Sequence, residues 1–286
     1  MRLSARRRSS WSGLFGEMAG DSRRLLLRGG LCDVVRMGRG EPIVLVPGLA
    51  GGWKLLAPLA RRLARRHEVI LYGLRGDRGP IVAPRAESME GYADDLAEVI
   101  ESLGLERPAI LGVSFGGAVA LEFAVSHPGL VGALVVQGAE ARFRKSLGSQ
   151  IALGVLERFP MPADNPFFNQ FFNLLHAGKP DSASLADFVV ERCWETDQGA
   201  MARRLRALES FDVADRLWQV EAPTLILGGT RDAIVPVARQ RSLAEAIPGA
   251  RFEALEGGGH IGFLTHRDEI TRQVGRHVRA SRRSYC

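Results

Sequence analysis

The stretch GVSFGG at residues 112–117 decides how the rest of this 286-residue chain is interpreted. It follows an apolar run at 108–111 and leads into a run of small residues at 116–120, an order that predicts a strand, a tight turn and a helix. A serine at such a turn is lifted out of the sheet with a strained backbone, and the flanking glycines leave room for neighbouring main chain. The hydroxyl of Ser114 is therefore a candidate nucleophile.

Apolar runs and helical patterns alternate on both sides of this turn. Short apolar runs predict strands at 43–46, 69–71, 109–113, 133–136, 224–227 and 251–255, after an opening hairpin at 25–35. Segments with helical spacing lie between them, which indicates a parallel sheet with helices on both faces. From about residue 144 to 220 the strand-like runs stop and helical spacing continues. We expect a basic, flexible segment at 1–22, an α/β core at 23–143 and 221–286, and a helical insertion at 144–220.

Two further residues complete a candidate set for nucleophilic catalysis. His260 follows three glycines after the last predicted strand, and Asp232 follows the strand at 224–227 through a glycine turn. Because the carboxyl ends of parallel strands share one edge of the sheet, both are expected beside Ser114. A histidine there can take and return a proton, and a carboxylate can hold it in one tautomer. Glu140 follows the preceding strand and is the alternative acid.

Backbone donors for a developing oxyanion are expected at two turns. The N–H of Phe115 opens the helix after the nucleophile, and the N–H of Leu49 lies in the turn PGLAGG at 47–52. One such donor is worth about 3 kcal/mol in a transition state. A phosphate-binding loop is disfavoured because the turn lacks the lysine and the Ser or Thr that follow such a loop.

With these motifs the chain resembles the α/β-hydrolase family over nearly its whole length. The matching pieces are VLVPG at 44–48, LRG at 74–76, GVSFGG at 112–117, APTLILGGTRDAIVP at 222–236 and GGGH at 257–260. The resemblance implies an eight-stranded, mostly parallel sheet with a helical cap inserted after the sixth strand. It also implies that Ser114, Asp232 and His260 form a catalytic triad, with Leu49 and Phe115 as the oxyanion hole.

Two departures from the family pattern matter. Many relatives have His-Gly where this chain has Pro47-Gly48, which keeps the backbone donor and removes any role for that histidine. Relatives that cleave carbon–halogen bonds or epoxides carry Asp at the nucleophile position. Ser114 therefore argues against both of those activities.

The insertion is rich in aromatic residues, and we expect a few of them to line an apolar substrate pocket. The candidates are Phe167, Phe171 and Trp194. The expected activity is hydrolysis by water of a small or medium hydrophobic carboxylic ester through an acyl-enzyme on Ser114. The same residues would serve a C–C bond hydrolase, a lactonase, a thioesterase, a cofactor-free perhydrolase or an acyltransferase, and a non-catalytic ligand-binding protein on the same scaffold stays open.

The composition of the chain indicates which classes of partner are disfavoured. The net charge of +6 comes from the ends: residues 1–28 hold seven Arg against one Glu and one Asp, residues 276–286 hold four Arg, and the body is net −3. Nucleic-acid binding is not indicated.

Three widely spaced cysteines suggest neither disulfides nor a metal site, and no apolar run is long enough to span a membrane. We expect a cytoplasmic protein with no cofactor and no metal, and the sequence leaves its oligomeric state open.

Overall fold

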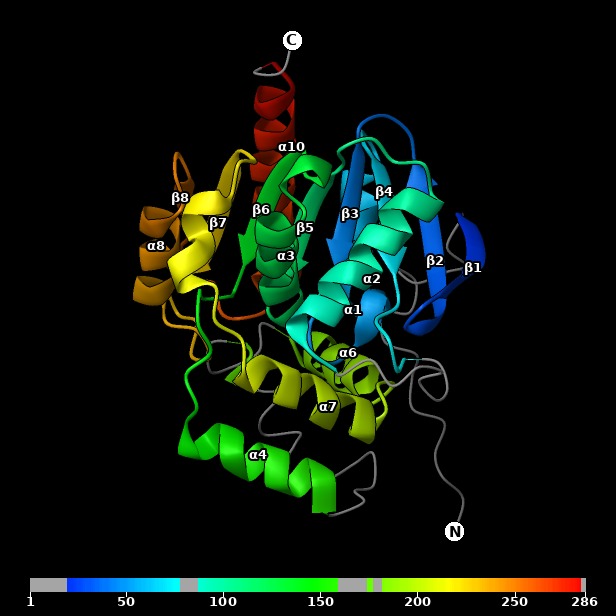
Figure 1. The fold of residues 1–286 in the computed structure, drawn as a ribbon. Helices are drawn as coiled ribbons and strands as arrows, with labels where there is room; N and C mark the ends of the chain where they lie inside the picture. The colour runs from blue at the N-terminus through cyan, green and yellow to red at the C-terminus, as the bar shows by residue number, and fades with distance from the viewer. Residues whose placement is uncertain (1–19, 78–86, 159–173, 177–181, 284–286) are drawn as a thin grey trace.

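The computed structural model describes residues 20–77, 87–158, 174–176 and 182–283. Its centre is one eight-stranded sheet with the strand order β1-β2-β4-β3-β5-β6-β7-β8 (Figure 1). The strands are β1 (Asp21–Leu27), β2 (Gly30–Gly38), β3 (Pro42–Val46), β4 (Glu68–Tyr72), β5 (Ala109–Val113), β6 (Ala133–Gln137), β7 (Thr224–Gly229) and β8 (Arg251–Leu255). β1 and β2 form an antiparallel hairpin, β2 runs antiparallel to β4, and β3 to β8 are parallel. The predicted α/β fold and its mostly parallel sheet are confirmed.

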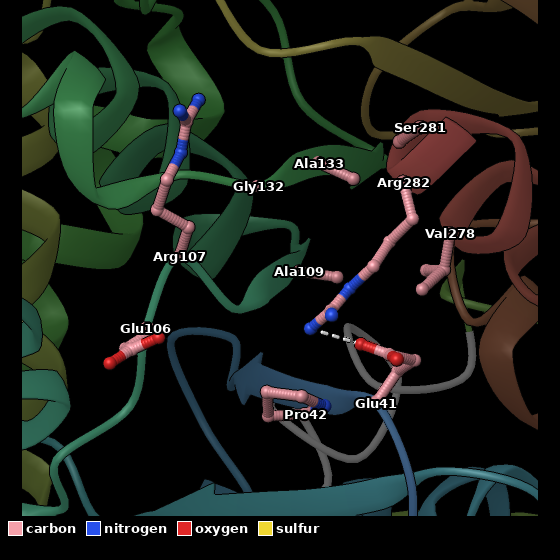
Figure 2. A pocket seen from close by; sticks show the side chains of 10 residues that line it. All are labelled: Glu41, Pro42, Glu106, Arg107, Ala109, Gly132, Ala133, Val278, Ser281 and Arg282. Atoms are coloured by element: carbon pink, nitrogen blue, oxygen red, sulfur yellow. Dashed lines mark ion pairs between the residues drawn. The ribbon is translucent and has the colours of Figure 1, made fainter. Parts of the chain in front are cut away.

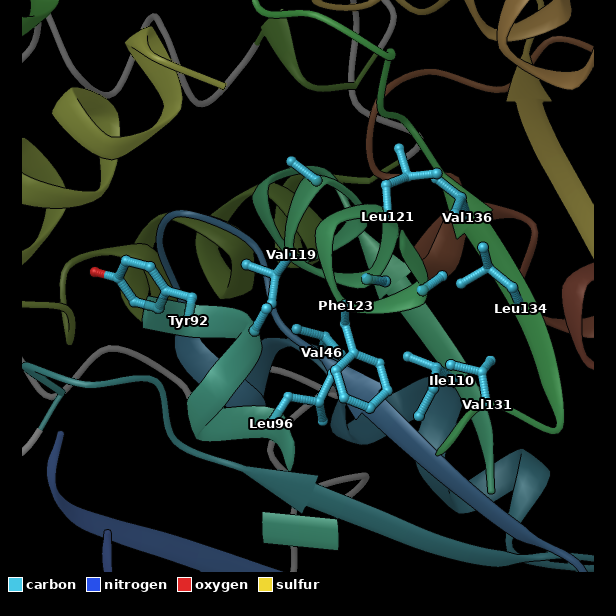
Figure 3. Close-up of a cluster of buried hydrophobic side chains, with 14 of the residues drawn as sticks. Val46, Tyr92, Leu96, Ile110, Val119, Leu121, Phe123, Val131, Leu134 and Val136 are labelled. Atoms are coloured by element: carbon cyan, nitrogen blue, oxygen red, sulfur yellow. The ribbon is translucent and has the colours of Figure 1, made fainter. Parts of the chain in front are cut away.

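Two hydrophobic clusters cover the two faces of the sheet, because successive strand residues point to opposite sides. In β3, Val44 and Val46 belong to one cluster, while Ile43 and Leu45 belong to the other. The first cluster packs under α2 (Met89–Ser102), α3 (Phe115–Ser126) and α8 (Val237–Ala246), and Figure 3 shows part of it. The second lies under α1 (Gly52–Leu63), α9 (Gly262–Thr265) and α10 (Arg267–Arg283). The central strands are therefore buried on both faces, as their unbroken apolar sequences indicate.

Among the described residues between β6 and β7, three α-helices occur, and we call them the inserted helices: α4 (Leu147–Arg158), α6 (Ala183–Cys193) and α7 (Gln198–Glu209). They sit beyond one end of the sheet, at the bottom of Figure 1. The chain leaves and re-enters the core through a short antiparallel bridge between Arg142 and Asp212, which also form an ion pair of 2.5 Å.

The segment boundaries differ slightly from those expected. β1 starts at Asp21, so the end of the segment 1–22 is part of the sheet, and residues 1–19 lie outside the described residues. The 3₁₀ helix η3 (Ala214–Gln219) packs against α3 with Leu217 in the first core cluster, so this part of the expected insertion lies against the core. The end of the insertion is thus set by the packing of Leu217 into the core. The absence of strand-like runs in the sequence does not indicate where this packing begins.

Candidate active site

Ser114 stands at the turn between β5 and α3. Its φ of 55° is in the left-handed region, which is strained for a residue with a side chain. The glycines around it are needed sterically: a Cβ at Gly112 would overlap the Gly116 carbonyl oxygen, and one at Gly116 would overlap the carbonyls of Val46 and Pro47. This close packing holds the serine at the carboxyl end of β5, and its side chain is only partly buried.

His260 reaches Ser114 from the loop that follows β8. Its Nε2 lies 2.8 Å from Ser114 Oγ, although 146 residues separate the two in sequence. The ring is almost completely buried, and Gln137 Nε2 donates to the His260 carbonyl oxygen at 3.0 Å. Gly138 faces the ring, and a Cβ there would lie 3.2 Å from His260 Cε1. A side chain at position 138 would therefore require the imidazole ring to shift by a few tenths of an ångström.

Asp232 lies on the other side of the imidazole. Its two carboxylate oxygens are 3.0 and 3.1 Å from His260 Nδ1. The backbone N–H groups of Ile234 and Val235 each donate to Asp232 Oδ1 at 2.9 Å. Burial alone would raise the pKa of Asp232, but the His260 charge and the hydrogen bonds to the carboxylate outweigh it and lower this pKa. The carboxylate is thus kept in its ionised form beside the imidazole.

Glu140, the alternative acid, has another partner. Its carboxylate forms an ion pair with Arg239 at 3.2 Å, and its pKa is raised by burial, with Arg239 partly offsetting this effect. Asp232 and His260 are in hydrogen-bond contact, whereas Arg239 Nη1 donates to the Glu140 carboxylate. The structure thus brings Ser114, His260 and Asp232 together in one row.

Two glutamines that sequence reasoning missed support this row. Gln240 of α8 is fully buried: its Nε2 donates to Asp232 Oδ2 at 3.2 Å and to the Val235 carbonyl at 2.8 Å, and its Oε1 accepts from the Gly138 N–H at 3.1 Å. Gln137 at the end of β6 supports His260 as described above. Gln137 could have been found from the sequence, because it is a polar residue at the end of an apolar strand, where the site lies. Gln240 lies in an ordinary polar helix sequence that carries no such signal.

The two expected oxyanion donors lie at neighbouring turns. Phe115 is the first residue of α3, where helix N–H groups have no partner within the helix. The loop of Leu49 rests against the nucleophile turn, since a Cβ at Gly48 would lie 3.7 Å from Ser114 Cβ. Within the described part of the chain, no hydrogen bond from the N–H of Leu49 or Phe115 occurs. Both N–H groups can therefore serve a ligand atom.

The expected pocket residues can be placed only in part. Phe167 and Phe171 lie outside the described residues. Trp194, at the end of α6, is half-buried and packs against the second core cluster, to which Leu49 and Trp53 also contribute. Apolar side chains of the Leu49 loop and of α6 thus belong to the same hydrophobic cluster.

A separate pocket of about 260 Å³ opens at the opposite edge of the sheet, where β3, β5 and β6 begin (Figure 2). An ion pair between Glu41 and Arg282 lies in its wall. Ser281 there donates its hydroxyl to the His277 carbonyl of its own helix at 2.9 Å. Among the described residues that line this pocket, neither Ser114 nor His260 occurs, so it does not belong to the candidate site.

Among the helices in the described ranges, none combines the length and the apolar sequence needed to cross a bilayer.

Comparisons with known proteins identify the family to which this fold belongs. A carbamate-hydrolase candidate, RutD of Pseudomonas savastanoi pv. phaseolicola, is 30% identical over 244 residues, covering 78% of this chain and 88% of that protein. The polyketide synthase ThaQ of Burkholderia thailandensis is 30% identical over 245 residues, but the chain spans only 12% of its length. The esterase EaEST of Exiguobacterium antarcticum shares the fold with a TM-score of 0.81 at 24% identity, covering 91% of this chain and 100% of the esterase. A family model described as the alpha/beta hydrolase family matches residues 43–273. The chain belongs to the α/β-hydrolase family.

Proposed function

We propose that this protein is a serine hydrolase that cleaves a small or medium hydrophobic carboxylic ester. The observation that carries the proposal is the continuous row of contacts from Ser114 Oγ through His260 to the Asp232 carboxylate, at 2.8 and 3.0 Å. Those atoms are close enough for proton transfer without rearrangement. The half-buried hydroxyl leaves one side of the nucleophile open to a substrate.

In the proposed reaction, Ser114 Oγ attacks the ester carbonyl carbon while His260 Nε2 takes the hydroxyl proton. The negative charge that develops on the carbonyl oxygen is stabilised by the N–H groups of Leu49 and Phe115. The intermediate collapses, the C–O bond to the alcohol breaks, and His260 gives its proton to the leaving oxygen. Water then attacks the acyl-enzyme, with His260 as the base, and releases the acid. Asp232 stays ionised and stabilises the protonated imidazole.

The apolar side chains of Leu49, Trp53 and Trp194, which pack against one hydrophobic cluster, support a hydrophobic acyl group, and the inserted helices act as the cap over it in this proposal. A carbamate is the second candidate substrate, favoured by the 30% identity with RutD. It presents the same carbonyl carbon to Ser114. Thioesters, lactones and C–C bonds are chemically compatible with the same residues.

The test is labelling with a fluorophosphonate probe and turnover of p-nitrophenyl esters and a p-nitrophenyl carbamate. Ser114→Ala is expected to lose labelling and at least a thousandfold in kcat/KM. Ser126→Ala is the matched control, because Ser126 Oγ also lies 3.0 Å from a histidine, His127 Nδ1, but donates to the Glu122 carbonyl. The control should keep both labelling and turnover.

Unlabelled wild-type protein without turnover of any substrate would instead support a ligand-binding protein on the hydrolase scaffold. Faster turnover of the carbamate than of every ester would favour the second candidate.

A further inference from the structure

Arg204, on the inserted helix α7, reaches into the core beside the candidate oxyanion loop. Its side chain is fully buried. Nη1 donates to the Leu49 carbonyl oxygen at 3.0 Å, and Nη2 donates to the Arg75 carbonyl at 3.2 Å and to the Asp77 carboxylate. One guanidinium thus binds two main-chain segments that follow different strands, β3 and β4. Leu49, a candidate oxyanion donor, is thus held through its own carbonyl by a residue from the insertion.

A second contact from the same region holds the loop at Gly51, two residues after Leu49. The buried hydroxyl of Thr196, between α6 and α7, accepts a hydrogen bond from the Gly51 N–H at 2.9 Å. Gly51 and Gly52 have φ values of 82° and 50°, which only glycine adopts without strain. A loop with two such glycines has many accessible backbone conformations when nothing fixes it. Its conformation therefore depends on hydrogen bonds from the inserted helices.

Arg204 also acts on Tyr92, a residue that packs against Phe115, the other candidate donor. The Phe115 ring packs edge-on against Tyr92 with the ring centroids 5.0 Å apart. Burial raises the pKa of Tyr92 to about 12, and the nearby positive charge of Arg204 partly offsets this.

Stability alone does not explain an arginine here. A buried ion pair such as Arg204 with Asp77 carries a large desolvation cost, and apolar residues of similar volume often stabilise a protein equally well. An apolar residue, however, cannot donate a hydrogen bond to the Leu49 carbonyl oxygen, as Arg204 does.

We propose that Arg204 is a positioning residue that sets the oxyanion hole, so that docking of α7 onto the core completes the catalytic site. The inference rests on the proposed serine hydrolase function. Fixing the Leu49 carbonyl restricts rotation about the Leu49 Cα and thereby aims its N–H at the substrate oxygen. Such alignment acts on the transition state and leaves ground-state binding of the ester largely unchanged.

The experiment measures kcat and KM for a p-nitrophenyl ester, and Ki for an alkylboronic acid, whose tetrahedral adduct with Ser114 places an oxygen in the hole. Arg204→Met is expected to lower kcat about 10- to 100-fold, raise Ki by a similar factor and leave KM within about threefold. Arg204→Lys, which keeps a donor, should recover part of the loss. Arg206→Met is the control, since Arg206 is an exposed arginine of α7 that pairs with Glu157 inside the insertion.

Because Arg204→Met leaves the Asp77 carboxylate without its partner, the double variant Arg204→Met with Asp77→Asn is measured as well, together with the thermal unfolding of each protein. The same kcat and Ki losses in a folded double variant would support the inference. Unchanged kcat and Ki, or losses matched by an equal rise in KM, would overturn it. If the wild-type protein neither hydrolyses esters nor reacts with a fluorophosphonate, the proposed function itself has failed.

Discussion

The two sides of the candidate site are held in different ways. The row formed by Ser114, His260 and Asp232 is anchored within the core, through Gln137, Gln240 and the backbone after Asp232. The glycine loop that carries Leu49 is anchored from outside the core, by Arg204 and Thr196. In the proposed mechanism, the side that transfers protons is thus built into the α/β framework, whereas the side that stabilises negative charge depends on the insertion. A change in the insertion can then alter the rate while the three core residues stay in place.

The largest effect expected within the core-anchored side comes from the acid. Asp232→Asn removes the charge that stabilises protonated His260 and permits the wrong tautomer, so kcat should fall about 10³- to 10⁴-fold. Glu140→Gln is the matched change of a neighbouring carboxylate, which pairs with Arg239. It should change kcat less than about threefold. Steady-state kinetics of both variants on one ester decides the assignment, and a larger loss from Glu140→Gln would reverse it.

A smaller loss is expected when the imidazole is displaced. In Gly138→Ala the new Cβ would lie 3.2 and 3.3 Å from His260 Cε1 and Nδ1, so the ring must move. A displacement of this kind costs on the order of 10- to 100-fold in kcat.

Gly249→Ala separates ring displacement from backbone strain. Gly249 has a φ of 67°, close to the 69° of Gly138, and a Cβ there would meet no atom within 4 Å. Both variants should unfold at lower temperature, because alanine is strained at either φ. Only Gly138→Ala should lose turnover; equal kcat in the two variants would mean that the ring tolerates the added carbon.

The effect of Gln240 should be smaller again. Gln240→Leu removes one donor to Asp232 and the acceptor for the Gly138 N–H, and we expect kcat to fall about tenfold. If Gln240 acts through Asp232, the same change in an Asp232→Asn background should cost much less, and a double-mutant cycle measures this difference. Fully additive losses would show that Gln240 acts independently of the acid.

The sequence predicts the core-anchored side far better than the other. Ser114, His260 and Asp232 each follow a recognisable apolar strand through a glycine turn, so local sequence indicates that they meet at one sheet edge. Arg204 has no such signal. In the sequence it belongs to a series of arginines at 203, 204 and 206, and only the packing of α7 shows that one is buried while Arg206 is exposed. Contacts between an insertion and a core depend on tertiary packing, which periodicity does not encode.

The end of the insertion could not be predicted from the sequence either, because it too depends on tertiary packing. η3 has no strand-like run, so the sequence assigns it to the insertion, although Leu217 packs into the core. The pocket aromatics Phe167 and Phe171 stay predictions, and Trp194 remains a candidate on the strength of its apolar neighbours.

The smallest expected effect is on stability. As the pH falls, the ionisation of Asp232 and that of Glu140 should change the melting temperature in opposite directions. The pKa of Asp232 is lowered in the folded protein from its ordinary value of 3.8, so the ionised carboxylate stabilises the fold. That contribution is present above about pH 4 and is lost as the pH falls through the lowered pKa. The melting temperature of the wild-type protein relative to Asp232→Asn should therefore decline below pH 4.

Glu140 should behave in the opposite way. Burial raises its pKa above 4.5 despite Arg239, so its ionised form costs stability at neutral pH, and this cost disappears as acidification protonates it below the raised value. Relative to Glu140→Gln, the wild-type melting temperature should rise as the pH falls towards 4.5. Melting curves of the three proteins between pH 7 and pH 3 test both signs together. Parallel slopes for the two carboxylates would mean that burial and hydrogen bonding do not distinguish them, which removes the electrostatic reason for choosing Asp232 as the acid.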